Sequence, residues 1–306
     1  MKAPQITIFT TMKPFRGEFI RIQRNAIRSW LALEPTPEIL VFGNDEGVAE
    51  VCSAFDLRHI PDTCTAPSGA PYLDDLFAKA QKLASRDLLC YINADIILLP
   101  HFMSVVGTVY SRFGQAIIAC VPVNARIDFD LDTTSPLWED QVRKEINRRS
   151  ISPVGADIFL FPRSFTWNPP KVVVGRWWWD CALLWRACTA QIPAIDVSAT
   201  LVAIHQDHSY TTHPGSQNRI TQTYDSKIQK EIQSNFRAIR WWERTTWRID
   251  IPYELTEDGH IIRRFLFPRC HLFGAIVFRK VNHTKQWVLE RTFRLRRYFR
   301  LYRWWA

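Results

Sequence analysis

The sequence lacks several features that would each define a class of protein. No uninterrupted apolar run among its 306 residues reaches the length that spans a membrane. The seven cysteines do not occur in the close pairs that bind structural zinc. Residues 11–17, which follow the first predicted strand, contain one glycine and so do not form a glycine-rich phosphate loop. With no internal repeat and no low-complexity segment, the chain is expected to be an ordinary globular protein.

Positive charge is present but unevenly distributed. The formal net charge is +9, and residues 285–306 alone contain seven Lys or Arg and one Glu, a net charge of +6. The rest of the chain has 32 basic and 29 acidic residues, a net charge of only +3. A nucleic-acid-binding domain would show a broad basic face. We therefore expect no nucleic-acid partner.

The cysteines and the N-terminal residues indicate a compartment. Cys90 and Cys120 lie in apolar, strand-like segments, as expected for small buried side chains in a reducing environment. The N-terminal residues show no signal-peptide pattern and lead directly into a strand-like segment. We expect a cytoplasmic protein, with a peripheral membrane location as the alternative.

Apolar periodicity predicts strands that alternate with helices in the first half of the chain. Strands are expected at 6–10, 38–43, 59–61 and across 88–99, and helices at 19–33, 48–55 and 73–84. The second half is less regular, with strands expected at 116–121, 157–161 and 200–205 and helices at 138–149, 180–190 and 227–242. This order predicts an α/β fold whose mainly parallel sheet is flanked by helices. We place one domain at 1–240 and a C-terminal helical extension at 241–306.

A polar island, Asn93-Ala94-Asp95, interrupts the apolar run 88–99. A buried carboxylate is costly without compensation, so we expect Asp95 where the strand ends, at the rim where open α/β sheets bind ligands. There it would hold Mg²⁺ or Mn²⁺ with a diphosphate. The alternative is a buried Asp that caps the turn at Pro100. Asp45 follows the second strand and would lie on the same edge, although Asp is also common in simple turns.

Two later motifs add further polar groups. Trp177, Trp178 and Trp179 cannot all share one face, so at least one is expected to face solvent or a pocket. Asp180 follows them at a predicted helix start, which also suits a helix N-cap. His205 and His208 come just after a predicted strand, with Asp207 between them. A lone His is more often structural, but this cluster favours metal ligation, without the further ligands of a zinc site.

These motifs resemble those of GT-A fold glycosyltransferases over residues 5–210. The matching segments are the Thr-Ile-Phe-Thr-Thr strand, the Asn-Asp-Glu-Gly turn, the Pro-Tyr-Leu-Asp-Asp segment at 71–75, Asn93-Ala94-Asp95 and Trp179-Asp180. The resemblance implies a GT-A type, Rossmann-like fold in which Asp95 holds Mn²⁺ or Mg²⁺, with His205 or His208 as a further ligand. Asn93 departs from the family's Asp-any-Asp motif, because it has an amide where a carboxylate is usual.

The resemblance also implies an activity and roles for individual residues. A nucleoside-diphosphate sugar would be the donor, bound by Thr10, Asp45, Asn93, Asp95 and Trp179. Asp180 would act as general base, and Asp157 is a further candidate for holding donor or acceptor hydroxyls. The acceptor would be a hydroxyl of a glycan or of a lipid-linked glycan. The alternatives are a non-catalytic carbohydrate-binding scaffold and, less favoured because of the single glycine in 11–17, a sugar-1-phosphate nucleotidyltransferase.

The C-terminal segment 285–306 predicts an amphipathic helix. Apolar residues gather on one side and arginines on the other: Leu295, Tyr298, Phe299, Leu301, Tyr302 and Trp305 against Arg296, Arg297, Arg300 and Arg303. A helix with a basic face and an aromatic face suits an anionic membrane surface. The alternative is a helix that packs its aromatic side chains on the catalytic domain and leaves its arginines in water.

Overall fold

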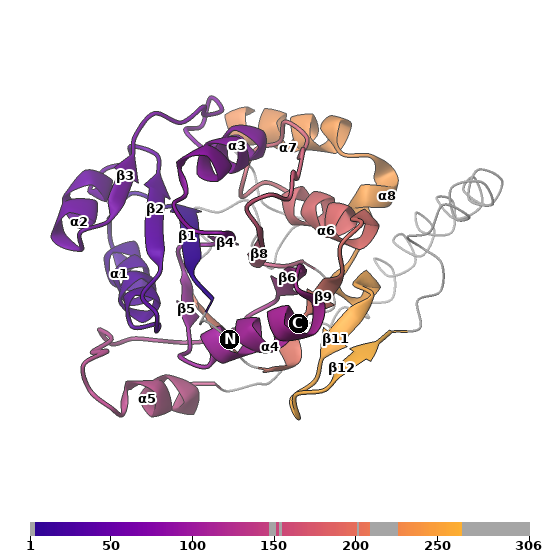
Figure 1. Cartoon of the computed structure of the whole chain (residues 1–306). Helices are drawn as coiled ribbons and strands as arrows, with labels where there is room; N and C mark the ends of the chain where they lie inside the picture. Colours follow the sequence, from indigo (N-terminus) through magenta and orange to yellow (C-terminus); the bar gives the residue numbers. More distant parts are fainter. Residues whose placement is uncertain (1–3, 147–150, 153–154, 201, 209–225, 265–306) are drawn as a thin grey trace, which may run out of the picture.

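The computed structural model describes residues 4–146, 151–152, 155–200, 202–208 and 226–264. Its centre is a nine-stranded sheet (Figure 1). The strands run in the order β12 (Ile261–Arg263), β11 (Tyr253–Leu255), β9 (Ala194–Asp196), β6 (Ile117–Cys120), β8 (Ile158–Pro162), β4 (Leu88–Ile92), β1 (Ile6–Thr11), β2 (Glu38–Phe42) and β3 (Arg58–Ile60). All neighbours are parallel except where β8 or β12 is a partner. The predicted mainly parallel sheet is confirmed.

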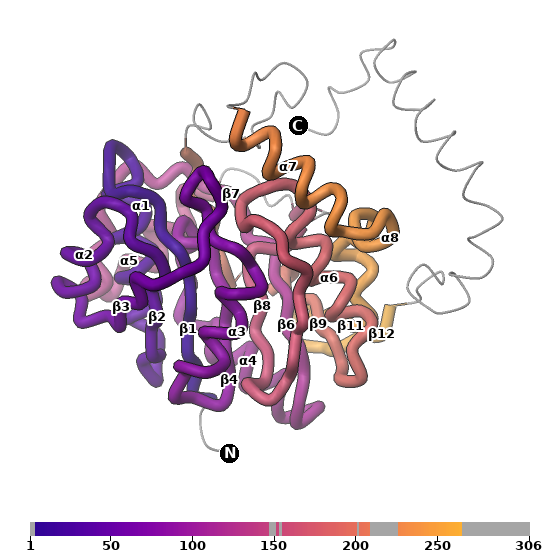
Figure 2. The backbone as a smooth tube through the Cα atoms, turned by 90° about the horizontal axis from the view of Figure 1, so that it is seen from above, coloured from indigo at the N-terminus to yellow at the C-terminus, as the bar shows by residue number. Residues whose placement is uncertain are grey.

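Helices cover both faces of this sheet. One face packs against α1 (Glu18–Leu31), α2 (Val48–Ala54) and α4 (Phe102–Phe113). The other face packs against α3 (Leu73–Leu83) and α6 (Trp179–Thr189). The next helices, α7 (Ser226–Ala238) and α8 (Trp241–Arg244), lie on the same side of the molecule as α3 and α6 (Figures 1 and 2). The predicted flanking helices are therefore confirmed.

A second, smaller sheet lies beside the main one. It contains β5 (Ile96–Leu98), β10 (Ala203–Gln206) and β7 (Val123–Ala125), in that order. Its apolar side chains pack with Trp138 and Val142 of α5 (Trp138–Lys144) in a third core cluster. The indole N–H of Trp30 on α1 donates to the Ile96 carbonyl at 2.9 Å, which ties this sheet to the main body.

Strands β1 and β4 show how the sequence builds two buried faces. Ile8 pairs with Cys90 on one face, and Phe9 pairs with Tyr91 on the other. Successive side chains of a strand point to opposite faces, so strands that are apolar throughout are buried on both sides. All four side chains are buried, as the apolar runs predict.

The apolar run 88–99 is not one strand, however. β4 ends at Ile92, and β5 begins at Ile96 in the other sheet, antiparallel to β10. The polar island forms the turn between them, with the Ile96 N–H donating to the Asn93 carbonyl at 3.2 Å. Periodicity could not separate these cases, because two short buried strands in different sheets are as uniformly apolar as one long strand.

The domain boundary at residue 240 stays a prediction, and the described residues beyond it continue the main sheet. β11 pairs with β9 and β12 pairs with β11, so residues 253–263 extend the main sheet. Buried Asp196 on β9 binds both Arg248 and Arg264, which come from beyond that boundary. The remainder of the predicted extension, including the basic segment 285–306, lies outside the described residues. Within the described ranges, no helix combines the length and the apolar character needed to cross a membrane.

The Asp196 cluster gives a first prediction. Asp196→Ala leaves the largely buried Arg248 guanidinium without a carboxylate and leaves Arg264 with Glu254 alone, so the free energy of unfolding should fall by about 3 kcal/mol. Urea unfolding measures this change. Asp62→Ala is the control, because the Asp62 side chain is fully exposed and its loss should cost roughly 0.5 kcal/mol or less. Equal losses in the two variants would show that the cluster does not hold β11 on the sheet.

Candidate metal centre and active site

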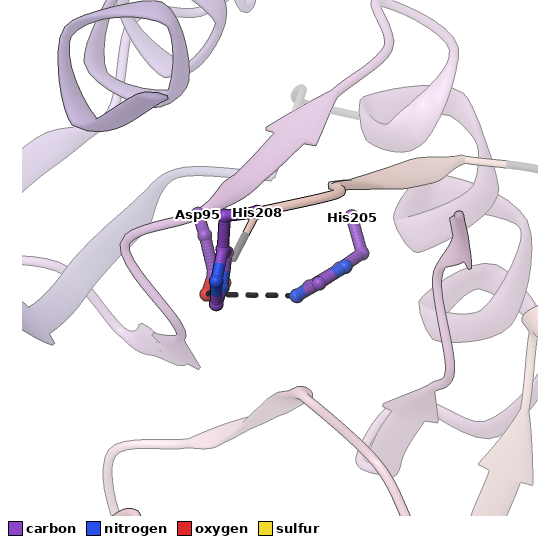
Figure 3. A group of neighbouring side chains, drawn as sticks. All are labelled: Asp95, His205 and His208. Carbon is purple, nitrogen blue, oxygen red and sulfur yellow. Dashed lines mark hydrogen bonds and ion pairs between the residues drawn. The ribbon is translucent and has the colours of Figure 1, made fainter. Parts of the chain in front are cut away.

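Three side chains converge beside the turn between β4 and β5 (Figure 3). Asp95 Oδ2 lies 3.3 Å from His208 Nε2 and 3.6 Å from His205 Nε2. One potential ligand atom from each residue lies within 4.8 Å of the other two. The side chain of His208 is 1% exposed, and those of His205 and Asp95 are 12% and 15% exposed.

Strand pairing in the small sheet produces this convergence. His205 on β10 lies opposite Ile96 on β5, directly after Asp95 in the chain. The Gln206 N–H donates to the Asp95 carbonyl at 3.1 Å, which fixes the end of β10 against the turn. His208 follows two residues later. Asp95 and His205, 110 positions apart in the chain, therefore meet because the chain passes from β4 in the main sheet to β5 in the small sheet at the turn that carries Asp95.

Two buried atoms of the cluster have no hydrogen-bond partner within the described part of the chain. They are Asp95 Oδ1 and His205 Nδ1. A buried polar atom without a partner costs free energy, and such atoms are rare in folded proteins. A divalent cation accepts electron pairs from carboxylate oxygens and imidazole nitrogens. The residues fit such an ion, and a set with two imidazoles suits Mn²⁺ better than Mg²⁺, which prefers oxygen ligands.

The charges around Asp95 favour its ionised form. Burial alone would raise the pKa of the Asp95 carboxyl, but His205, His208 and Lys13 outweigh burial and hold this pKa well below its usual range. For His205, burial lowers the pKa, but Asp95 raises it further, so the net shift is upward. The site therefore presents a carboxylate that is charged and surrounded by cationic or proton-bearing partners.

Lys13 was not singled out from the sequence. Its backbone is held by Gln23, which accepts from the Lys13 N–H at 2.7 Å and donates to the Lys13 carbonyl at 2.9 Å. Lys13 Nζ lies 4.2 Å from the centre of the Phe19 ring, and that ring packs on His208 at 5.1 Å. Burial lowers the Lys13 pKa, and Asp95 opposes the shift. The sequence does contain a signal for Lys13, because a cation that follows the first strand is expected at the same sheet edge as Asp95.

Asn93, two residues before Asp95, connects this turn to a second carboxylate. Its side-chain Nδ2 donates to Asp157 Oδ1 at 2.8 Å, and its Oδ1 accepts from the Tyr91 hydroxyl at 3.0 Å. The predicted donor-binding residue thus orients Asp157. Burial raises the Asp157 pKa to about 7; His205 opposes this shift, and the charges of Asp95 and Asp180 add to it. The three carboxylates therefore share one electrostatic environment.

Asp180 is the second residue of α6. The residue at the N-cap is Trp178, so the alternative assignment of Asp180 as the N-cap is wrong. The N-terminal end of a helix nevertheless favours a negative charge. Gly155 has a positive φ of 82°, and a Cβ there would lie 3.0 Å from Asp180 Oδ2. A glycine is therefore needed where the chain entering β8 approaches this carboxylate.

Two other predicted donor-binding residues belong to the core. Thr10 is fully buried, and its hydroxyl donates to the Ile92 carbonyl at 2.6 Å. Trp179 is 7% exposed and packs edge-on against Tyr91 at 5.3 Å. Both side chains are therefore buried in the described structure, and their role in donor binding stays a prediction. Asp45 is exposed and follows β2, whose end shares an edge with β1 and β4, so its role stays a prediction.

No family model matches this sequence, and no curated protein matches it. Solved structures of similar arrangement include S. aureus TarS in complex with UDP-GlcNAc, with a TM-score of 0.49 and 6% identity, covering 72% of this chain and 62% of that chain. Another is the glucosyl-3-phosphoglycerate synthase of Mycobacterium tuberculosis in complex with Mn²⁺, UDP-glucose and phosphoglyceric acid. Its TM-score is 0.42 at 13% identity, covering 78% and 81% of the two chains. The match thus spans less than two thirds of the TarS chain, and these likenesses concern the fold alone.

The cluster predicts a metal-binding defect in Asp95→Asn. The amide keeps the shape of the side chain but removes its charge, so Mn²⁺ affinity should fall at least about tenfold. Isothermal titration calorimetry of chelator-treated protein with MnCl₂ measures it. Asp45→Asn is the matched control and should bind Mn²⁺ as the wild type does. Unchanged binding in Asp95→Asn would place the ion elsewhere.

Asp157 predicts a pH-dependent stability in the metal-free protein. Its folded-state pKa of about 7 lies above the unfolded value of ~3.9. Its contribution to stability is therefore full below pH ~4 and is lost as the pH rises through about 7. Asp157→Asn does not titrate, so relative to the wild type it should gain about 2–3 kcal/mol between pH 5 and pH 8. Urea unfolding in EDTA at the two pH values tests this, and a pH-independent difference would contradict it.

Proposed function

We propose that this protein is a glycosyltransferase that moves a sugar from a nucleoside-diphosphate sugar to a hydroxyl of a glycan or lipid-linked acceptor. The observation that carries the proposal is the convergence of Asp95, His205 and His208, where the buried Asp95 Oδ1 has no hydrogen-bond partner among the described residues. A cation and two more carboxylates adjoin this cluster. The combination supplies both a diphosphate-binding part and a proton-accepting part.

The donor is proposed to bind on the Asp95 side. Asp95, His205 and His208 would hold Mn²⁺ or Mg²⁺, which when bound offsets the charge of the departing diphosphate. Lys13 contributes a positive charge beside these residues; Gln23 fixes its backbone, and its Nζ lies 4.2 Å from the centre of the Phe19 ring. A charge placed in advance stabilises a developing anion without reorganisation. Asp45, on the same sheet edge, is proposed to contact the nucleoside.

The acceptor is proposed to bind on the Asp180 side. Asp180 accepts the proton of the attacking hydroxyl while the new glycosidic bond forms and the bond from the sugar to the diphosphate breaks. Asp180 lies in the first turn of α6, where the helix dipole favours a negative charge. Asp157 interacts electrostatically with Asp95 and Asp180, and Asn93 fixes its orientation. It is therefore positioned to accept a hydrogen bond from a sugar hydroxyl between the two parts.

The test begins with a thermal-shift screen of sugar nucleotides with Mn²⁺, followed by an assay for released nucleoside diphosphate. Release that depends on an added acceptor is the expected result. Binding without release under any acceptor would favour the carbohydrate-binding scaffold, for which the amide of Asn93 in place of a carboxylate is the supporting feature. If no sugar nucleotide binds, the proposal is wrong.

Asp180→Asn separates binding from transfer. The substitution removes the base but keeps the size of the side chain, so donor affinity should stay within about threefold and transfer should fall by about two to four orders of magnitude. Calorimetry with the donor from the screen and a rate assay measure the two quantities. Asp74→Asn, in the first turn of α3, is the matched control at a helix start. An equal loss of donor affinity in Asp180→Asn would indicate a structural role.

A further inference from the structure

The outer surface of α7 and α8 exposes charges of one sign. The three acidic residues between 226 and 250 are Glu231, Glu243 and Asp250, and all are buried. Glu231 binds Arg176 at 2.7 Å, and Glu243 binds Arg186 at 2.9 Å. Asp250 accepts from the backbone N–H of Trp247 at 2.8 Å. The acidic side chains of this segment thus face inward.

The cations of the same segment face outward. Lys230 and Arg237 are exposed and lie two turns apart on α7, so they occupy one face of the helix. Arg240, between α7 and α8, is exposed as well. Residues 226–250 therefore expose positive charges to solvent and no carboxylates.

Aromatic and apolar side chains are interleaved with these cations. Phe236 is 50% exposed, and Trp247 and Ile249 are 38% and 39% exposed. They are half of the six exposed large hydrophobic residues in the described ranges, although they come from a span of 14 residues. The Arg244 guanidinium lies 3.7 Å from the centre of the Phe236 ring. Phe236 lies on α7 itself, next to Arg237 in the chain, and an exposed aromatic side chain among cations is typical of an interaction surface.

We propose that this α7–α8 face, defined by Lys230, Phe236, Arg237 and Arg240, docks on an anionic lipid bilayer. Aromatic side chains suit the headgroup level of a bilayer, and Lys or Arg beside them attract anionic lipids. The chain's own segment 285–306 is a poor occupant, because its net charge of +6 has the same sign as the face. A second copy of the face would be repelled in the same way.

The α7–α8 face adjoins the proposed acceptor side. Phe236 contacts Trp178, with 5.5 Å between ring centres, and Trp178 lies two residues before Asp180. The Arg186–Glu243 ion pair and the packing of α6 on α8 fix the two parts relative to each other. A bilayer at this face would bring a lipid-linked acceptor to Asp180; this last link alone rests on the proposed function.

The experiment is co-sedimentation of the full chain with vesicles of phosphatidylcholine, with and without phosphatidylglycerol, at low salt. The test variant is Lys230→Glu/Arg237→Glu. The control, Arg24→Glu/Arg112→Glu, makes the same change in net charge at exposed positions on α1 and α4. The wild type and the control should bind anionic vesicles alike, and the test variant should bind at least about tenfold more weakly. Circular dichroism melts verify that both variants fold.

A second pair of variants tests the apolar contribution. Phe236→Ser should weaken binding several-fold at a salt concentration that screens the charges. Leu137→Ser is the control, because Leu137 is also exposed but lies on the other side of the molecule, before α5. Equal binding by these two variants would remove the apolar contribution and contradict docking at the lipid headgroups.

Three further results would overturn the proposal. The first is that the wild type does not bind anionic vesicles, and the second is that both charge-reversal variants lose vesicle binding equally. The third is that the test variant loses polyuridylate binding while its vesicle binding is unchanged. The last result would make an acidic polymer the occupant.

Sugar transfer to a soluble acceptor is measured in parallel without vesicles. Normal transfer together with failed docking would reject this inference alone, whereas absent transfer with intact docking would reject only the proposed function.

Discussion

The site depends on one constraint: a carboxylate must be buried where the chain leaves the main sheet. Burial disfavours the charge of Asp95, and the structure compensates with two histidines and Lys13. The compensation is available because β5 turns away from β4 and pairs with β10, which carries His205. Without that change of sheet, the carboxylate would lie among apolar side chains of a long strand. The second sheet is therefore a requirement of the site.

Two carboxylate environments lie side by side in this site and behave in opposite ways. Asp95 faces histidines and a lysine, and its pKa is depressed. Asp157 is buried and faces the carboxylates of Asp95 and Asp180, and its pKa is raised to about 7. Pairs of titratable groups whose surroundings separate their pKa values are typical of sites that divide ligand binding from proton transfer. Asn93 links the two environments through its hydrogen bond to Asp157.

The last described segment completes the same structural unit as the site. Asp196 joins β9 to Arg248 and Arg264, and β11 and β12 extend the sheet. In the same segment, Glu231 binds Arg176 and Glu243 binds Arg186 of α6. These pairs neutralise the acidic side chains of α7 and α8 internally. The exposed charges of this surface are therefore the cations Lys230, Arg237 and Arg240. The surface is held against α6, which carries Asp180.

The sequence by itself determined the α/β class, the order of its first strands and helices, and the three residue types that the fold brings together at Asp95, His205 and His208. Apolar period and the positions of polar residues at strand ends are local properties, so they could be deduced without a structure. The tertiary structure alone decided that 88–99 forms two strands in different sheets, that Thr10 and Trp179 are core residues, and that Lys13 adjoins Asp95. It also decided that residues 253–263 belong to the main sheet. Each of these depends on which distant segments pair, and local periodicity carries no information about a partner far away in the chain.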